Sequence, residues 1–381
     1  MVLKLIWSDI MSLKLFHTSD LHIGMKFNRY PEDVKELLVN ARIEILERLI
    51  NLANERQCDI FTIAGDLFDK ISRIPKKDLM RVIKILNGFS GEVVLIIPGN
   101  HDYDNGVTEL WEDFQNNITE KILLLNHNKC YDLSMFDINA TIYPAFCDKK
   151  HSKENNLQWI KKLDKLPDSK FHIGMAHGAL KNISPDLENK YFNMSEEELL
   201  NLNLDLWLIG HTHIPYPNNN KVKFHKVYNA GTPEPDGMDC NHEGSAWFIE
   251  LDENKNVTAE SVKTGRYKFM DIDYKIEDEN DFKNLNRKFY SDNILARINL
   301  NGRIDRKLYE NRYNYYNELS KKLVYLDIDD TNLGIKITKE VIEKEFTKDS
   351  FPYQFLKGLY EDSQDEDALQ LAYELILEVK E

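Results

Sequence analysis

Five short apolar runs in this chain are each followed at once by residues that can bind a metal ion. The runs are Leu13–Thr18, Ile60–Ala64, Val93–Ile97, Phe171–Ala176 and Leu206–Ile209. Stretches with helical spacing of apolar residues lie between them, for example at 33–56. Continuous apolar strands interleaved with helices are typical of sheets that are buried on both faces. The sequence therefore predicts an α/β fold whose strands lie between flanking helices.

The polar residues after these runs form five motifs: Asp20-Leu21-His22, Gly65-Asp66-Leu67-Phe68-Asp69, Gly99-Asn100-His101-Asp102, His177-Gly178 and Gly210-His211-Thr212-His213. In the first and last motifs the two ligand residues are two positions apart, so on extended chain both side chains reach one ion. Any single motif arises by chance. Their recurrence at the carboxyl ends of strands, where open α/β sheets bind ligands, predicts one shared site.

The residue types in these motifs indicate the kind of ion. Aspartate and asparagine oxygens mixed with imidazole nitrogens suit manganese, iron or zinc better than magnesium or calcium. None of the motifs contains cysteine, which argues against a closed structural zinc site. Two divalent ions about 3.5–4 Å apart can hold a phosphate oxygen, generate hydroxide and stabilise in-line displacement. We therefore expect phosphoester hydrolysis at two metal ions, with manganese first and iron or zinc as alternatives.

The ordered set of motifs resembles the calcineurin-like metallophosphoesterase superfamily, over residues 14 to about 250. Within it, Asp20–Gly24, Gly65–Asp69 and Tyr228–Glu234 resemble the SbcD-type DNA double-strand-break repair nucleases. The last segment departs from that family's Tyr-x-Gly-Ser-Pro-Glu pattern by threonine for serine and one extra residue. The resemblance implies a layered fold of central β-sheets flanked by helices, and an exonuclease or endonuclease that acts on DNA ends.

The resemblance also implies roles for individual residues. One metal would be bound by Asp20, His22, Asp66 and His213, and the second by Asp66, Asn100, His177 and His211. Asp66 would bridge the two ions. His101 would not bind metal but would stabilise the transition state or protonate the leaving oxygen. Asp69 would orient His101 and favour its protonated form, unless it only caps its loop.

The charge of the chain sets a condition on DNA binding. A formal net charge of −15 excludes a protein that holds nucleic acid by a globally basic surface. The segment 70–84 is locally basic, and we expect its first part to contact the phosphate backbone through Lys70, Arg73, Lys77 and Arg81. The alternative is an ordinary solvated helix face.

The sequence pattern predicts three parts: a metallophosphoesterase (nuclease) domain at 1–265, a small α/β capping domain at 266–345, and amphipathic helices at 346–381. Within the second part it predicts a helix at 305–323 between strands at 294–299 and 324–328, and in the third part it predicts two helices. By the resemblance, the terminal helices dock an SbcC-type coiled-coil ATPase. The chain has no GxxxxGK[ST] motif, so any ATP dependence must come from another chain. Family members commonly form homodimers through the nuclease domain, and the helix at 33–56 is a candidate surface.

Two other readings remain: a small-molecule phosphatase or cyclic-nucleotide phosphodiesterase, and a non-catalytic scaffold. The scaffold is disfavoured because every ligand position is filled. The four cysteines show no CxxC spacing, which indicates free thiols. No apolar run approaches the roughly 20 residues that span a bilayer, and residues 1–11 lack a secretory signal. We expect a cytoplasmic protein without membrane contact, in which residues 1–10 are an upstream extension or a frayed terminus before Met11.

Overall fold

The computed structural model describes residues 12–72, 74–186, 188–240, 242–289, 291–362 and 366–380. The chain forms two compact units, Met1–Lys268 and Phe269–Glu381. Residues 1–11, which hold the alternative start Met11, lie outside the described residues, as does Arg73 of the basic segment.

The first unit contains two β-sheets. The seven-stranded sheet has the order β4 (Ile122–Leu124), β3 (Val93–Ile97), β2 (Ile60–Ala64), β1 (Ser12–Thr18), β11 (Ser245–Asp252), β12 (Val257–Lys263), β9 (Lys221–Lys223). The five-stranded sheet has the order β10 (Val227–Asn229), β8 (Leu206–Gly210), β7 (Phe171–His177), β6 (Ala140–Ala145), β5 (Tyr131–Asp132). Strands β1 to β4 are mutually parallel, as are β6, β7, β8 and β10. The strands predicted at the five motifs are therefore present.

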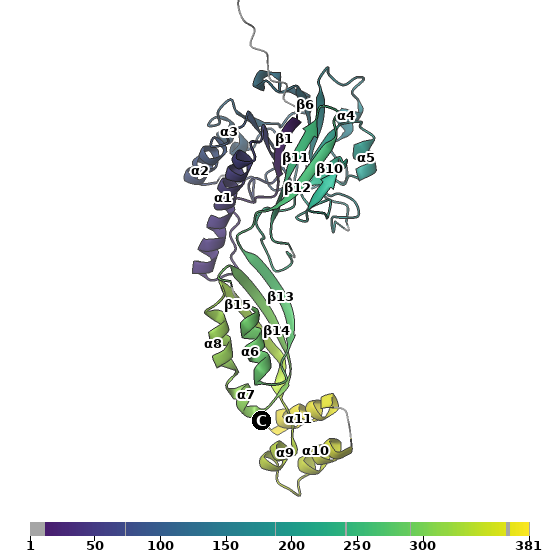
Figure 1. Ribbon diagram of the computed structural model, residues 1–381. Coiled ribbons are helices and arrows are strands. Elements are labelled where there is room, and N and C mark those ends of the chain that lie inside the picture. Colours follow the sequence, from purple (N-terminus) through teal and green to yellow (C-terminus); the bar gives the residue numbers. More distant parts are fainter. Residues whose placement is uncertain are drawn as a thin grey trace, which may run out of the picture. The chain divides into compact units, whose positions relative to one another are not determined.

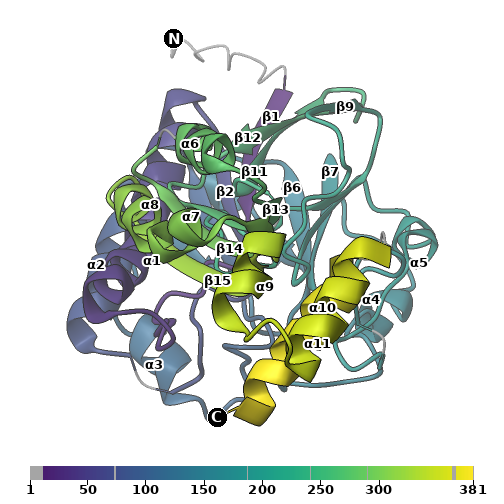
Figure 2. The ribbon, with the colours of Figure 1, turned by 90° about the horizontal axis from the view of Figure 1, so that it is seen from below.

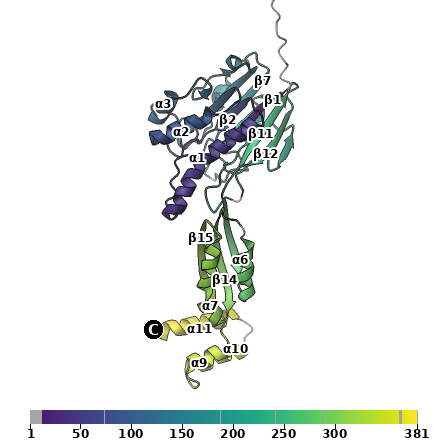
Figure 3. The ribbon, with the colours of Figure 1, turned by 60° about the vertical axis from the view of Figure 1, so that its left-hand side comes forward.

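The two sheets pack face to face between two layers of helices. Alternate side chains of one strand explain this: Phe61 and Ile63 of β2 contact the helical layer, whereas Ile60 and Ala64 contact the second sheet. Figures 1 and 3 show the first helical layer on one side of the seven-stranded sheet, formed by α1 (Glu32–Glu55), α2 (Lys76–Leu86) and α3 (Glu109–Gln115). The outer face of the five-stranded sheet is covered by α4 (Gln158–Lys161) and α5 (Glu196–Leu200). The predicted layered α/β architecture is confirmed.

The second unit begins with a three-stranded sheet of order β13 (Lys268–Lys275), β14 (Ile294–Ile304), β15 (Tyr325–Ile335). Figure 2 shows three helices together beside this sheet: α6 (Glu279–Lys288), α7 (Arg306–Glu310) and α8 (Arg312–Ser320). We expected one helix at 305–323, but a break at Asn311 divides it in two. Strands β14 and β15 are also longer than expected, because pairing resumes after an irregularity at Asn299–Asn301.

Three helices end the chain: α9 (Lys339–Glu345), α10 (Phe351–Asp362) and α11 (Glu366–Lys380). The sequence predicted the last two, which lie side by side in Figure 2, and missed α9. Side chains from all three meet in one apolar cluster that includes Ile342, Leu356 and Tyr373. The helices therefore stabilise one another.

None of the helices in the described ranges is long and apolar enough to cross a bilayer. All four cysteines are free thiols, as expected, and three of them, Cys58, Cys147 and Cys240, are buried.

A close contact in the second sheet gives a stability prediction. Gly174 of β7 pairs directly with Trp207 of β8, and a Cβ atom at Gly174 would lie 2.3 Å from the Trp207 ring. We expect Gly174→Ala to lower the free energy of unfolding by about 1–3 kcal/mol through overpacking, measured by urea titration. Trp207→Leu should remove the clash, so the double variant should be destabilised by less than the sum of the two single effects. Strictly additive effects would show that the two residues do not compete for space.

Candidate metal centre

The motif residues meet where strands of both sheets end. Asp20 and His22 follow β1, Asp66 follows β2, and Asn100 follows β3 of the first sheet. His177 ends β7 of the second sheet, with His211 and His213 following β8. The loops after β1 and β2 stay paired beyond the strands, since Asp20 N donates to Gly65 O at 3.1 Å and His22 N to Asp66 O at 3.0 Å. The predicted ligand residues of these two loops therefore lie on hydrogen-bonded backbone.

Four of the non-glycine motif residues have positive φ, a conformation that costs energy for residues other than glycine. The values are 55° for Asp20, 49° for His22, 52° for Asp66 and 104° for His211. Gly65 lets the sheets approach each other, because a Cβ atom there would lie 2.1 Å from His177 Nδ1. The fold thus holds strained backbone at the positions from which the motif side chains converge.

The first predicted ligand set is assembled. His22 Nε2 lies 3.1 Å from His213 Nε2 and 3.8 Å from Asp66 Oδ2, and His213 Nε2 lies 3.8 Å from Asp20 Oδ1. Asp20 Oδ2 already accepts hydrogen bonds from Ser19 Oγ at 2.5 Å and His211 N at 2.9 Å. Asp20 Oδ1 is buried and has no hydrogen-bond partner among the described residues. One carboxylate oxygen is therefore left to face the two imidazoles.

The second predicted set is assembled beside it. His177 Nε2 lies 3.4 Å from Asp66 Oδ2 and 2.9 Å from Asn100 Oδ1, and His211 Nδ1 lies 2.8 Å from the same asparagine oxygen. His177 Nδ1 donates to Ala64 O at 2.8 Å, so the other ring nitrogen, Nε2, is the one that faces Asn100 and Asp66. Asp66 Oδ1 accepts His101 N at 2.8 Å. Asp66 Oδ2 is thus the atom that both sets share.

These contacts fit a pair of bound cations. The converging atoms are carboxylate oxygens, an amide oxygen and imidazole nitrogens, and such acceptors repel one another unless a cation or proton lies between them. The pKa values of the histidines also show that positive charge is favoured between these atoms. Burial opposes a charge on His177, but the adjacent Asp66 carboxylate outweighs it and raises the pKa of His177 to about 9. Burial, followed by the neighbouring His177, lowers the pKa of His211 to about 3. Metal binding would displace the proton on His177.

His101 lies at the edge of this cluster, and its ring centroid is 4.8 Å from that of His22. Its Nδ1 bonds to the backbone carbonyl oxygen of Asp69 at 3.1 Å, whereas the Asp69 carboxylate is farther away, at 4.0 Å. The Asp69 carboxylate also lies 3.9 Å from His22 Nδ1. The ring of His101 is therefore oriented by the main chain of Asp69, and its Nε2 is left for another partner.

Three further residues support the site, and the sequence alone assigned a role to none of them. Asp102 is buried and joins two motif loops, since it accepts from Gly99 N at 2.6 Å and Phe68 N at 3.0 Å. Burial, with the nearby Asp66, raises the pKa of Asp102 to about 7. Asp236 contacts His213 of the first predicted set, and Arg42 in turn lies beside Asp236. Arg42 had no distinguishing signal, because it looks like any charged residue of a long amphipathic helix.

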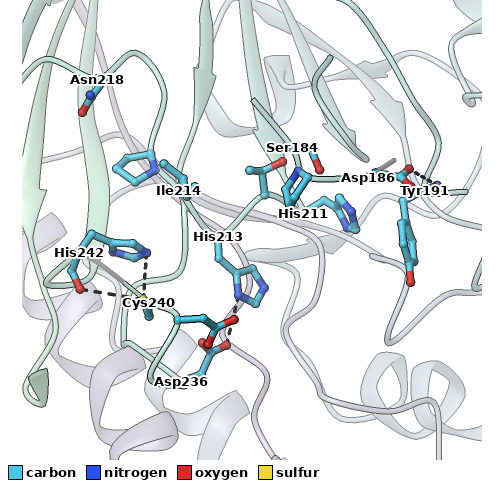
Figure 4. A pocket seen from close by; sticks show the side chains of 14 residues that line it. Ser184, Asp186, Tyr191, His211, His213, Ile214, Asn218, Asp236, Cys240 and His242 are labelled. Atoms are coloured by element: carbon cyan, nitrogen blue, oxygen red, sulfur yellow. Dashed lines mark hydrogen bonds and ion pairs between the residues drawn. The ribbon is translucent and has the colours of Figure 1, made fainter. Parts of the chain in front are cut away.

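A cavity of about 560 Å³ opens beside His211 and His213 (Figure 4). Its walls include Tyr191, whose ring centroid lies 4.9 Å from that of His211, and the exposed side chain of Ile214. Asp186, Asp236 and Asp239 also line it, and the described lining contains no lysine or arginine. The cavity therefore offers acidic and apolar groups next to the two ligand sets.

The predicted DNA-contacting residues come after Asp69 in the sequence. Lys70 comes directly after Asp69 and is exposed. Lys77 and Arg81 lie on α2, where Lys77 is exposed and Arg81 is half-buried. The opposite face of α2 packs in the core through Leu79, Val82, Ile83 and Leu86. The structure leaves this part of the expected strip open to solvent.

The chain is similar to several known proteins. It is 25% identical over 230 residues to the uncharacterized metallophosphoesterase YhaO of Bacillus subtilis, covering 55% of this chain and 54% of that protein. It is 25% identical over 224 residues to the SbcD component of the SbcCD nuclease of Staphylococcus saprophyticus, covering 54% and 57%. The match thus spans about half the length of these curated relatives. A crystal structure of TT1561 from Thermus thermophilus aligns with 13% identity and a TM-score of 0.40, covering 66% of this chain and 99% of that one.

A sequence model of the calcineurin-like phosphoesterases matches residues 13–215, which is more than half of the chain and contains all seven predicted metal ligands. This chain belongs to the calcineurin-like phosphoesterase family.

Proposed function

We propose that this chain is a two-metal phosphodiesterase that acts on DNA ends, like the SbcD-type nucleases that its motifs resemble. The observation that carries the proposal is Asp66 Oδ2, which is 3.8 Å from His22 Nε2 in one ligand set and 3.4 Å from His177 Nε2 in the other. Two ions bound there supply Lewis acidity and an activated water for phosphoester hydrolysis. The mixed oxygen and nitrogen ligands favour manganese, with iron or zinc as alternatives.

His101 is the group placed for proton transfer or charge stabilisation. Its backbone N–H fixes Asp66 Oδ1, and its ring is held at Nδ1 by Asp69 O. The side chain is 38% exposed, so Nε2 can reach a phosphate or leaving-group oxygen that enters from solvent. The Asp69 carboxylate lies 4.0 Å from His101 Nδ1 and 3.9 Å from His22 Nδ1, where it can help to orient both rings.

Two observations favour DNA over a small substrate. One relative is part of a nuclease by name, and the exposed cations after Asp69 provide a local contact for a phosphate backbone on an otherwise acidic chain. A small-molecule phosphodiesterase is the second candidate, and the cavity beside His211, which is lined by Asp186, Asp236 and Asp239, favours it. A phosphate-rich strand would be repelled there, whereas an uncharged leaving group would not.

We expect His101→Gln to lower turnover of a chromogenic phosphodiester by about 10²–10⁴-fold, because the variant has no proton-transfer group at this position. Bound manganese, measured by elemental analysis, should remain as in the parent, since no predicted ligand atom changes. A His101→Gln protein that arrives without metal would make His101 a ligand and overturn this assignment.

We expect Lys77→Gln/Arg81→Gln to weaken duplex binding and to lower the slope of log affinity against log salt by roughly 0.9 for each phosphate that the variant no longer neutralises. Hydrolysis of the chromogenic phosphodiester should not change. Lys162→Gln/Lys165→Gln, which removes two exposed cations beyond α4, is the matched control. If both double variants bind DNA equally well, the α2 residues are only a solvated face and the small-substrate candidate gains.

We also propose that the terminal helices dock a coiled-coil ATPase of the SbcC type. Three apolar side chains four positions apart on α11 are exposed: Leu371 (58%), Leu375 (51%) and Val379 (88%). Four-residue spacing places them on one face of the helix. Such an exposed stripe is typical of a surface that a partner covers. A homodimer through α1 stays a prediction.

Because Leu356 and Tyr373 join α9, α10 and α11 in one core, point changes test docking better than deletion. We expect Leu371→Glu/Leu375→Glu to abolish co-purification with the ATPase, while the thermal midpoint and small-substrate turnover stay near those of the parent. Met135→Glu introduces a charge at another exposed apolar residue and should leave co-purification intact. Retained binding by the α11 variant would place the docking surface elsewhere.

A further inference from the structure

Asp236 lies behind the imidazole of His213, as Figure 4 shows. Its Oδ2 is 3.2 Å from His213 Nδ1, while the other ring nitrogen, Nε2, faces His22 and Asp20. A histidine that donates from one nitrogen to a carboxylate presents the lone pair of the other to a metal in a fixed direction. Asp236 thus acts on the same imidazole that the first ligand set requires.

Arg42 of α1 connects Asp236 to the rest of that set. Its guanidinium is completely buried, with Nη2 3.7 Å from Asp236 Oδ2. Its Nη1 donates at 3.4 Å to Leu21 O, the carbonyl between Asp20 and His22, and at 3.4 Å to Thr232 Oγ1. Thr232 Oγ1 in turn donates to Asp20 O at 3.0 Å. One buried cation therefore contacts Leu21, which lies between Asp20 and His22, reaches the Asp20 backbone through Thr232, and lies beside the carboxylate that contacts His213.

The charges show why the two residues belong together. Arginine stays protonated in proteins, and a buried cation without a carboxylate nearby is costly. Arg42 Nε and Nη2 have no hydrogen-bond partner among the described residues, so Asp236 is its close anionic neighbour at an ion-pair distance. The Asp236 carboxylate in turn offsets the positive charge of Arg42, which would otherwise repel a metal ion bound at His213 Nε2.

We propose that Asp236, held by Arg42, is a positioning residue that directs His213 at the first metal ion and sets the affinity of that site. The proposal rests on the two-metal function proposed above and adds residues outside its ligand sets. Asp239, three positions later in the same loop, lines the same cavity, and no hydrogen bond or ion pair joins it to a ligand within the described structure. It provides a matched comparison.

The test is manganese binding rather than turnover. Calorimetric titration should give two ions per chain for the parent, and anomalous diffraction at limiting manganese should show which site fills. We expect Asp236→Ala to weaken the site at Asp20, His22 and His213 by about 10–100-fold, while the His177 and His211 site changes much less. Asp236→Asn keeps a hydrogen-bond acceptor but loses the charge, so its manganese affinity at the first site should lie between those of the parent and Asp236→Ala. Asp239→Ala should bind manganese like the parent.

A double variant separates positioning from simple charge. If Asp236→Ala acts only by leaving the Arg42 cation unpaired, then Arg42→Met/Asp236→Ala should restore affinity and overturn the proposal. Continued weak binding at the first site, with a metal-free thermal midpoint near the parent's, supports it. Equal affinity of Asp236→Ala and the parent at both sites also overturns it. A parent that binds neither manganese nor iron nor zinc would instead refute the proposed function, before any variant is compared.

Discussion

Asp66 is the residue on which the arrangement of the site depends. Its Oδ1 accepts His101 N, its backbone carbonyl accepts His22 N, and its Oδ2 lies between imidazoles that come from both β-sheets. That position requires the ends of the two sheets to approach closely. The approach is possible because residue 65 is glycine, since a Cβ atom there would lie 2.1 Å from His177 Nδ1 of the other sheet. Gly99 in turn makes room for the Asp66 carboxylate, because a Cβ atom at Gly99 would lie 2.2 Å from Asp66 Oδ1. The packing of the two sheets therefore also fixes the geometry of the site.

The same closeness concentrates charge that the protein alone cannot neutralise. Asp20, Asp66 and Asp102 are all buried within the motif loops, and burial favours the uncharged form of each. The Asp66 carboxylate nevertheless keeps a pKa well below its usual range, because the attraction of His177 outweighs burial. A proton on a histidine ring therefore supplies the positive charge that a bound metal cation would supply. The site favours positive charge even though the chain has a net charge of −15.

The sequence was informative where residues that can bind a metal directly follow an apolar strand. Short apolar runs predicted the parallel strands, and parallel strands bring their carboxyl ends to one edge, so residues as distant as Asp20 and His213 were expected to meet. Asp236 and Arg42 carry no such signal. One sits in a loop, and the other looks like a solvated helix residue until tertiary packing buries it. The break at Asn311 and the extra helix α9 were missed for a related reason, because short elements depend on tertiary contacts more than on local pattern.

The structure separates the groups that suit hydrolysis from those that suit substrate choice. The predicted ligands come from strand ends and five of the seven are buried, so their geometry is set by the core of the first unit. The groups that would distinguish substrates lie on surfaces and loops: the cations of α2 and the acidic cavity beside His211. A phosphate backbone is attracted to the first and repelled by the second. A strand bound at the metals would therefore run toward α2, and the cavity would receive only a part of the substrate that carries no phosphate.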